Sequence, residues 1–140
     1  MSDSQTNSAD ESLMALAAEA RQRAYAPYSR YQVGAAVRTP DGSVYVGCNV
    51  ENASYGLTVC AERVAVFSAV AAGHTRVTQV AIMTPSRGAP CGACRQVLLE
   101  FGGADLLILL ADPEGGLRER RLADLLPEAF GPDDLRAANS

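Results

Sequence analysis

The residues that most constrain this chain are three cysteines and one glutamate, which fall in two short segments. Cys91 and Cys94 lie three residues apart, so on one helical turn their thiols face the same way. Together with Cys60 they can occupy three corners of a tetrahedron around Zn²⁺, and the fourth corner stays open, as in catalytic zinc sites. Glu62 is not needed as a ligand, and a carboxylate beside a catalytic zinc is placed to move protons. We therefore expect one zinc ion on Cys60, Cys91 and Cys94, with Glu62 as the catalytic residue.

The fourth cysteine, Cys48, leaves open an alternative in which four thiols hold a purely structural zinc ion. Structural sites usually combine Cys-x-x-Cys with a second close pair, and Cys48 is far from Cys60 in the sequence. Such a site would also give Glu62 no role. By alternation along a strand, Cys48 shares a face with Val44, which is typical of a small buried hydrophobic residue. We therefore favour the three-cysteine site.

Composition narrows the classes of function that this chain can serve. Its 140 residues fit one domain, and 48% hydrophobic with 20% charged residues is ordinary for a globular protein. With a net charge of −4, the chain would repel a phosphate backbone, so we expect no nucleic-acid polymer as partner. No lysine is present, which excludes Schiff-base chemistry, and the only histidine, His74, follows a glycine at a predicted helix end. No apolar run is long enough to span a membrane and no signal-peptide core precedes residue 10, so we expect a cytoplasmic protein.

Hydrophobic periodicity and turn residues predict alternating helices and strands. A first helix begins at a cap, either Ser8 with Glu11 in a capping box or Asp10, and runs to about Ala24 before Pro27. Helices then alternate with strands, which favours a layered α/β domain with a mixed sheet. Flexible tails are expected at 1–9 and 136–140, around a single domain at 10–135. The expected strands are 33–39, 43–50, 76–84, 106–111 and 117–121, and the further helices are 60–72, 91–101 and 122–126.

Both cysteine segments lie where a loop enters a predicted helix, at Cys60 and Cys91. A helix N-terminus presents unpaired N–H groups and a partial positive charge, which lower the pKa of a thiol and favour the thiolate that zinc requires. Three thiolates leave Zn²⁺ with one excess negative charge, so a neighbouring cation is expected to offset it. Arg63 and Arg95 are the candidates, and Arg63 is the favoured one.

Three longer stretches, together with the cysteine motifs, resemble the small zinc-dependent cytidine deaminases that use three cysteine ligands. In the first stretch Pro27-Tyr28-Ser29 and Val33-Gly34-Ala35 match the family pattern, with Tyr31 where phenylalanine is usual and Gln32 where proline is usual. The other matches are the motif Cys60-Ala61-Glu62 followed by Pro90-Cys91-Gly92-Ala93-Cys94, the stretch Gly47-Cys48-Asn49-Val50-Glu51-Asn52-Ala53-Ser54-Tyr55-Gly56, and Leu125-Leu126-Pro127-Glu128-Ala129-Phe130.

The resemblance implies a three-layer α/β/α sandwich around a mixed, mostly five-stranded sheet. It implies hydrolysis of cytidine and 2′-deoxycytidine to uridine and 2′-deoxyuridine with release of ammonia, a step of pyrimidine salvage. It also implies a homotetramer and a set of substrate contacts. In the family, residues aligned with Asn49 and Glu51 bind the ribose, and Val50 between them is a further expected substrate contact. The ring at Tyr31 contacts the base, and the backbone of Ala61 reads the base edge. Phe130 closes the site of a neighbouring subunit, and the arginine aligned with Arg63 hydrogen-bonds a ligand sulfur.

Two departures from the family pattern bear on substrate range, and three rival functions remain. Tyr31 adds a hydroxyl group, and Gln32 removes the fixed φ of proline from the same wall. A blasticidin S-type or other small-base deaminase is the closest rival, although the stretch from Asn49 favours a plain nucleoside. A polynucleotide or transfer-RNA deaminase is disfavoured by the acidic charge and by Cys60 where those enzymes usually carry histidine. The non-enzyme rival is an interaction module stabilised by zinc.

Overall fold

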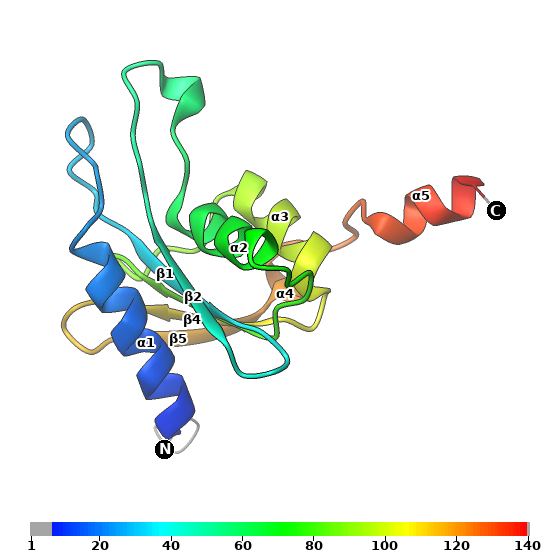
Figure 1. Cartoon of the computed structure of the whole chain (residues 1–140), viewed down its shortest axis with the longest axis horizontal. Coiled ribbons are helices and arrows are strands. Elements are labelled where there is room, and N and C mark those ends of the chain that lie inside the picture. Colours follow the sequence, from blue (N-terminus) through cyan, green and yellow to red (C-terminus); the bar gives the residue numbers. More distant parts are fainter. Residues whose placement is uncertain (1–6, 140) are drawn as a thin grey trace.

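The computed structural model describes residues 7–139, which form eleven helices and strands around one sheet (Figure 1). In chain order these elements are α1 (Ser8–Arg21), β1 (Gly34–Arg38), β2 (Val44–Cys48), the 3-10 helix η2 (Tyr55–Leu57), α2 (Ala61–Ala71), β3 (Gln79–Met83), α3 (Gly92–Gly102), β4 (Leu107–Ala111), β5 (Leu117–Arg121), α4 (Leu122–Leu125) and α5 (Pro132–Asn139).

The five strands form one mixed sheet in the order β2-β1-β3-β4-β5. β3 and β4 run parallel, and every other neighbouring pair is antiparallel. β1 is paired on both edges, because Gly34 lies opposite Cys48 of β2 and opposite Met83 of β3. The predicted mixed five-stranded sheet is therefore confirmed, and the predicted strands are right in number and order.

Helices cover both faces of the sheet and bury a separate apolar cluster on each (Figure 1). α2 and α3 pack on the face that carries Ala35 and Val37 of β1, whereas α1 packs on the face that carries Ala36. This division follows from the two-residue period of a strand, which sends successive side chains to opposite faces. The expected three-layer α/β/α arrangement is confirmed, and it fixes the first turns of α2 and α3 above one face.

The limits of α1 differ from those predicted at both ends. The cap is Asn7, whose side-chain oxygen accepts the backbone N–H of Asp10 over 2.9 Å, so the predicted caps at Ser8 and Asp10 are wrong. The helix ends at Arg21 rather than near Ala24, because the chain turns to let Tyr25 pair with residues beside β2. Local helix propensity up to residue 24 is thus overridden by a backbone contact with a distant segment.

The C-terminal helix α5 was not predicted and extends away from the rest of the domain (Figure 1). It begins at Pro132 and carries Asp133 and Asp134 in its first turn, which is favourable at a helix N-terminus. It covers residues 132–139, across the predicted boundary at 135. Of the predicted tails, residues 1–6 and Ser140 lie outside the described residues, and the limits of the domain stay predictions.

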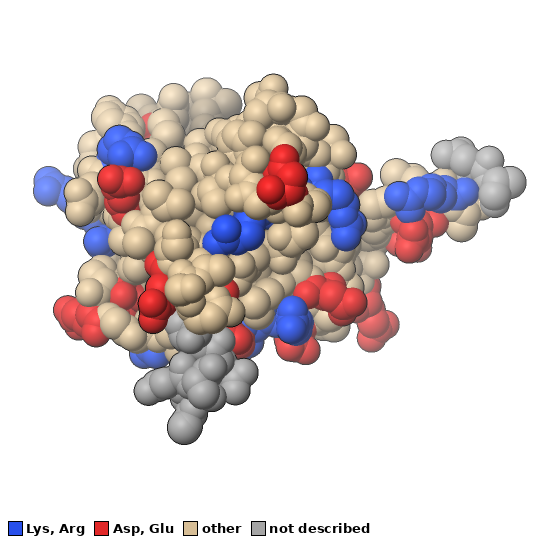
Figure 2. All heavy atoms as spheres, turned by 60° about the horizontal axis from the view of Figure 1, so that its bottom comes forward, with Lys and Arg blue, Asp and Glu red and all other residues tan. Residues whose placement is uncertain are grey.

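Charges on the molecular surface follow the acidic balance of the sequence. On the face drawn in Figure 2, arginine side chains are interspersed with aspartate and glutamate rather than gathered in one patch. Between residues 7 and 139, no helix combines the length and the apolar character that crossing a membrane requires.

Candidate metal centre and catalytic cleft

Two helix N-termini on the same side of the sheet bring the three predicted cysteine ligands together. Cys60 is the cap residue of α2, Cys91 is the cap residue of α3, and Cys94 lies in the first turn of α3. α2 and α3 both pack on the cluster that contains Ala35 and Val37, so their first turns lie close to each other. Residues that are thirty-one positions apart in the sequence thereby face one another.

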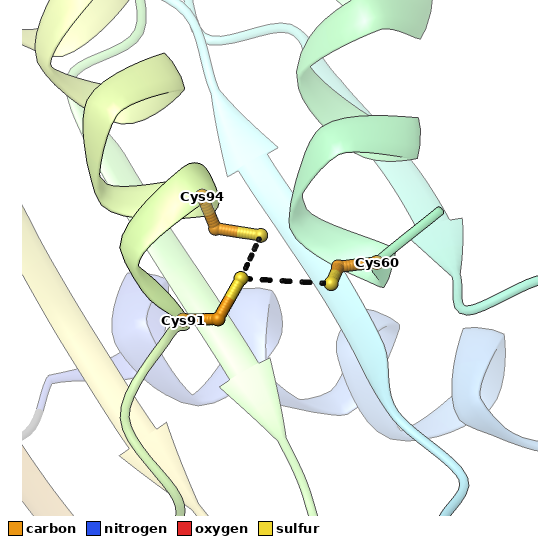
Figure 3. A group of neighbouring side chains, drawn as sticks. All are labelled: Cys60, Cys91 and Cys94. Atoms are coloured by element: carbon orange, nitrogen blue, oxygen red, sulfur yellow. Dashed lines mark hydrogen bonds between the residues drawn. The ribbon is translucent and has the colours of Figure 1, made fainter. Parts of the chain in front are cut away.

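The three sulfur atoms point toward a common centre (Figure 3). All three lie within 4.8 Å of one another, with 3.5 Å between the sulfurs of Cys91 and Cys94 and 3.8 Å between those of Cys60 and Cys91. Zinc–sulfur bonds of about 2.3 Å in a tetrahedron place sulfur atoms about 3.8 Å apart, so the observed spacing fits Zn²⁺. The group supplies three protein ligands, which leaves a fourth position for water or substrate.

Arg63 and the neighbouring thiols adjust the protonation of the cysteines. Hydrogen bonding with Cys94, followed by that with Arg63 and Cys91, lowers the pKa of the Cys60 thiol to about 5, although partial burial opposes this. The same hydrogen bond with Cys60, together with burial, raises the pKa of Cys94 well above its ordinary value. These shifts favour the thiolate form of Cys60 and the protonated form of Cys94, and a metal ion binds by taking the place of such protons.

Arg95, the second arginine considered near the ligands, contacts backbone rather than sulfur. Its Nε donates to the carbonyl of Pro90 and its Nη1 donates to the carbonyl of Leu125, both over 2.6 Å. Arg95 thus fastens the loop before Cys91 to the end of α4.

Glu62 lies in the first turn of α2, directly beside the cysteine group, and its side chain is buried. Burial is the main cause that raises its pKa, to about 7, and the nearby Cys60 thiolate acts in the same direction. No other side chain between residues 7 and 139 forms a hydrogen bond with its carboxylate. Such a group is free to exchange protons with a molecule in the neighbouring cleft.

A cleft of about 310 Å³ connects the cysteine group with the predicted substrate contacts. At one end it is lined by two of the ligands and by Glu62, and at the other end by polar side chains next to β2. Seven of the site residues predicted from the sequence line this cleft. They are Tyr31, Asn49, Glu51, Cys60, Ala61, Glu62 and Cys91. Residues from four separate stretches of the sequence, 29–33, 49–51, 58–62 and 84–91, therefore share one cavity.

Asn49 and Glu51 hold the 28–33 segment in place as one wall of this cleft. The Asn49 side chain accepts the backbone N–H of Val33 over 2.9 Å and donates to the carbonyl of Tyr31 over 2.8 Å. Glu51 accepts the backbone N–H groups of Tyr28 and Ser29 and the Ser29 hydroxyl. These hydrogen bonds with backbone and hydroxyl donors lower the pKa of Glu51, so it stays a carboxylate at the cleft.

Val50 and Phe130, two further predicted contacts, do not line the cleft within one chain. Val50 exchanges backbone hydrogen bonds with Val59 and is half exposed. Phe130 lies in the segment before α5, where its carbonyl accepts a hydrogen bond from Gln96, and the residue is 60% exposed.

Cys48 lies outside the cysteine group. In the described part of the chain its thiol forms a long contact of 3.4 Å with the carbonyl of Arg23, and the group of possible metal ligands does not include it. His74 is also remote from the cleft, with its ring against that of Tyr45 at a centroid distance of 5.4 Å.

The opposite wall of the cleft, the loop 84–90, was not identified from the sequence. Thr84, Gly88 and Ala89 line the cavity, and the Ser86 hydroxyl forms a 2.7 Å hydrogen bond with the hydroxyl of Tyr31. One feature of the sequence could have indicated this wall: the loop leads directly into Cys91, so it must pass beside the metal centre.

An open position beside a buried carboxylate distinguishes a catalytic zinc centre from a structural one, so the fold and site define a zinc-dependent hydrolytic enzyme. Comparison with known proteins specifies the class. Residues 7–110 match the model of the cytidine and deoxycytidylate deaminase zinc-binding region. The chain therefore belongs to the cytidine and deoxycytidylate deaminase family.

Similar proteins span the whole domain rather than the metal centre alone. A cytidine deaminase of Sporosarcina psychrophila is 44% identical over 130 residues, which cover 91% of this chain and 96% of that protein. One from Mycobacterium tuberculosis is 51% identical over 121 residues, covering 85% and 87%. The crystal structure of cytidine deaminase from Burkholderia pseudomallei superposes with a TM-score of 0.83 at 51% identity, covering 86% of this chain and 98% of that one.

Proposed function

We propose that this protein hydrolyses the exocyclic amino group of cytidine and 2′-deoxycytidine, giving uridine or 2′-deoxyuridine and ammonia. The observation that carries the proposal is the cleft in which Cys60, Cys91 and Glu62 meet Asn49 and Glu51. One end of the cleft thus carries the cysteines and the carboxylate that hydrolysis needs, and the other end carries groups that bind hydroxyls. The volume of the cleft suits one small polar molecule. A nucleoside has both features, a reactive base at one end and a hydroxylated sugar at the other.

The cysteine thiolates of 60, 91 and 94 would hold one zinc ion, which activates water as a nucleophile at neutral pH. Glu62 then serves as the proton carrier. It accepts the proton that water loses, delivers it to N3 of the pyrimidine and carries a second proton to the departing amino group. Its place in the first turn of α2, next to Cys60 and facing the cleft, supports this assignment.

The substrate contacts follow the lining of the cleft. Asn49 and Glu51 are proposed to bind the ribose, because amide and carboxylate groups hold hydroxyls and both residues line the cavity. Val50, between them in the sequence, is proposed as a further substrate contact. The ring of Tyr31 contacts the base from the 28–33 segment, the wall that Asn49 and Glu51 hold in place. Ala61 supplies a backbone N–H from the first turn of α2, where such groups lack partners within the helix.

We further propose that the active form is a cytoplasmic homotetramer in which Phe130 reaches the cleft of a neighbouring subunit. Phe130 and Leu135 are about 60% exposed, and α5 extends from the domain, so two large apolar side chains of this segment face solvent. A second copy is the expected cover. Size-exclusion chromatography with light scattering tests this directly: a tetramer that Phe130→Ala weakens supports it, and a wild-type monomer contradicts it.

The decisive experiment is an ammonia-release assay with cytidine, 2′-deoxycytidine, cytosine, adenosine and blasticidin S side by side. Turnover of the two cytidine nucleosides alone supports the proposal. Turnover of blasticidin S or another amine instead would retain the chemistry but reject the proposed sugar contacts. An interaction module stabilised by zinc predicts a different result. None of the five compounds would react although zinc is bound, and chelation would unfold the domain.

A further inference from the structure

The hydroxyl groups of Tyr31 and Ser86 join the two walls of the cleft. They share a hydrogen bond of 2.7 Å although 55 residues separate them in the sequence. Tyr31 belongs to the 28–33 segment, and Ser86 belongs to the 84–90 loop. No other side-chain hydrogen bond between residues 7 and 139 connects these two segments.

The position of this pair follows from the register of the sheet. The last paired residues of β1 and β3 are Gly34 and Met83, after which the two strands separate. Tyr31 and Ser86 each lie three residues beyond that pair, so they would be opposite one another if the ladder continued. Val33 and Thr84, in the interval, line the cleft. The cleft therefore opens where the ladder stops, and the hydrogen bond between the two hydroxyls spans the gap between the separated segments.

Each wall is anchored separately up to this point. On the first wall, Asn49 holds the backbone on both sides of Gln32, and the N–H of Tyr31 donates to the Ser29 hydroxyl over 3.0 Å. On the second wall, the buried Thr84 hydroxyl accepts the backbone N–H groups of Ser86 and Gly88 over 3.2 and 2.8 Å. These bonds order each segment separately but do not set the distance between the two, which only the hydrogen bond of Tyr31 with Ser86 spans among the side-chain hydrogen bonds of the described residues.

The space around the Tyr31 hydroxyl is also tightly defined. A Cβ atom at Gly88 would lie 3.0 Å from that hydroxyl and 3.4 Å from the one of Ser86, so a glycine lets the loop approach. The loop is fixed from outside by an ion pair of 3.0 Å between Arg87 and Asp112. The hydrogen bond between Tyr31 and Ser86 thus joins the 28–33 segment to the loop that leads into Cys91.

We infer that Tyr31 and Ser86 form a positioning pair for substrate binding: their hydrogen bond holds the two walls at the separation that the base requires. This inference rests on the proposed deamination. When the bond is lost, the walls separate, and the substrate must draw them together as it binds, which weakens binding. The thiols and Glu62 keep their places, because α2 and α3 hold them. The pair therefore affects KM rather than kcat.

The test is a double-mutant cycle on the zinc-loaded protein. Tyr31→Phe keeps the ring and removes the hydroxyl, and Ser86→Ala removes the other partner. Each is expected to raise KM for cytidine about fivefold, the equivalent of one neutral hydrogen bond, with kcat unchanged. The double variant should be no worse than either single variant, since all three lack the same bond. Ser86→Thr, which keeps a hydroxyl, restores KM, and Tyr45→Phe, remote from the cleft, is the matched control.

Hydrogen exchange provides a second measurement that needs no turnover. Amides of residues 84–90 should exchange faster in Tyr31→Phe and Ser86→Ala than in the wild type or Tyr45→Phe. Unchanged exchange, unchanged KM, or losses that multiply in the double variant would each overturn the inference. A wild type that fails to deaminate cytidine while these exchange differences appear would instead reject the proposed reaction and leave the pair established.

Discussion

The Nη2 atom of Arg63 lies 3.5 Å from the Sγ atom of Cys60 and donates a hydrogen bond to it. The two residues are one turn apart at the start of α2, so the guanidinium lies over the sulfur without any tertiary contact. A cation at this place offsets part of the excess negative charge that three thiolates leave on Zn²⁺. It also provides a reason for an arginine directly after Glu62.

Replacing Arg63 should weaken zinc binding without abolishing it. Arg63→Gln removes the charge and is expected to lower the affinity for Zn²⁺ about tenfold, because groups that hydrogen-bond metal ligands have effects of this size. Competition against a chromogenic chelator measures the affinity. The exposed Arg76, changed in the same way to glutamine, serves as control. Equal zinc affinity in Arg63→Gln and the wild type would contradict the assigned role.

Zinc content separates the three-cysteine site from a four-cysteine site. Cys94 is fully buried and its sulfur lies 3.5 Å from that of Cys91, so Cys94→Ala should purify with almost no zinc. Cys48→Ala is the matched control and should retain one zinc ion per chain, since Cys48 lies outside the group. Elemental analysis after desalting measures both. Loss of zinc from Cys48→Ala would instead favour the structural site with four cysteine ligands.

Much of this architecture could be predicted, because the periodicity of apolar residues identifies the elements and the need of one metal ion for three thiols brings two of the helices together. The alternation on β2 and the near-continuous apolar run of β4 identify the sheet, and the places where Cys60 and Cys91 open helices follow from loop and helix signals. Three thiols that must share an ion cannot lie far apart. The convergence of distant segments was therefore predictable without knowing the packing.

The parts that could not be predicted depend on contacts between distant residues. α1 stops at Arg21 because Tyr25 is bound by backbone groups near residue 50, which no local pattern reveals. The bond between Tyr31 and Ser86 depends on the register of β1 and β3. The start of α5 carries a helix N-terminal signal, a proline followed by two aspartates. The helix lies outside the core, however, and therefore lacks the apolar periodicity by which the other helices were predicted.

Glu62 can be separated from the zinc ligands by an isosteric change. Glu62→Gln keeps the shape of the side chain but cannot accept and return protons, so kcat should fall by at least about a hundredfold. Zinc content should stay at one ion per chain, because the thiols are intact. Glu100→Gln, an exposed carboxylate on α3, is the control for the chemical change. Full activity of Glu62→Gln would refute the proton-carrier role.

The close contact between β2 and α2 predicts a stability effect that reaches the metal centre. A Cβ atom at Gly47 would lie 2.5 Å from the backbone nitrogen of Ala65 and 2.6 Å from the carbonyl oxygen of Ala61. These are backbone atoms that cannot rotate away, so Gly47→Ala must displace α2 from the sheet. We expect the free energy of unfolding to fall by about 2 kcal/mol. The displacement should also weaken zinc binding, because α2 carries Cys60 at its first turn.

Gly56→Ala is the matched control for this substitution, since a Cβ atom there meets nothing within 4 Å. An alanine at such a site restricts the unfolded chain, so its free energy of unfolding should be unchanged or slightly higher. Denaturant titration of the two zinc-loaded variants beside the wild type measures the difference. If Gly47→Ala is as stable as Gly56→Ala, then β2 and α2 are not in the close contact from which this prediction starts. A stable Gly47→Ala variant with weak zinc binding would show instead that α2 moves without loss of the core.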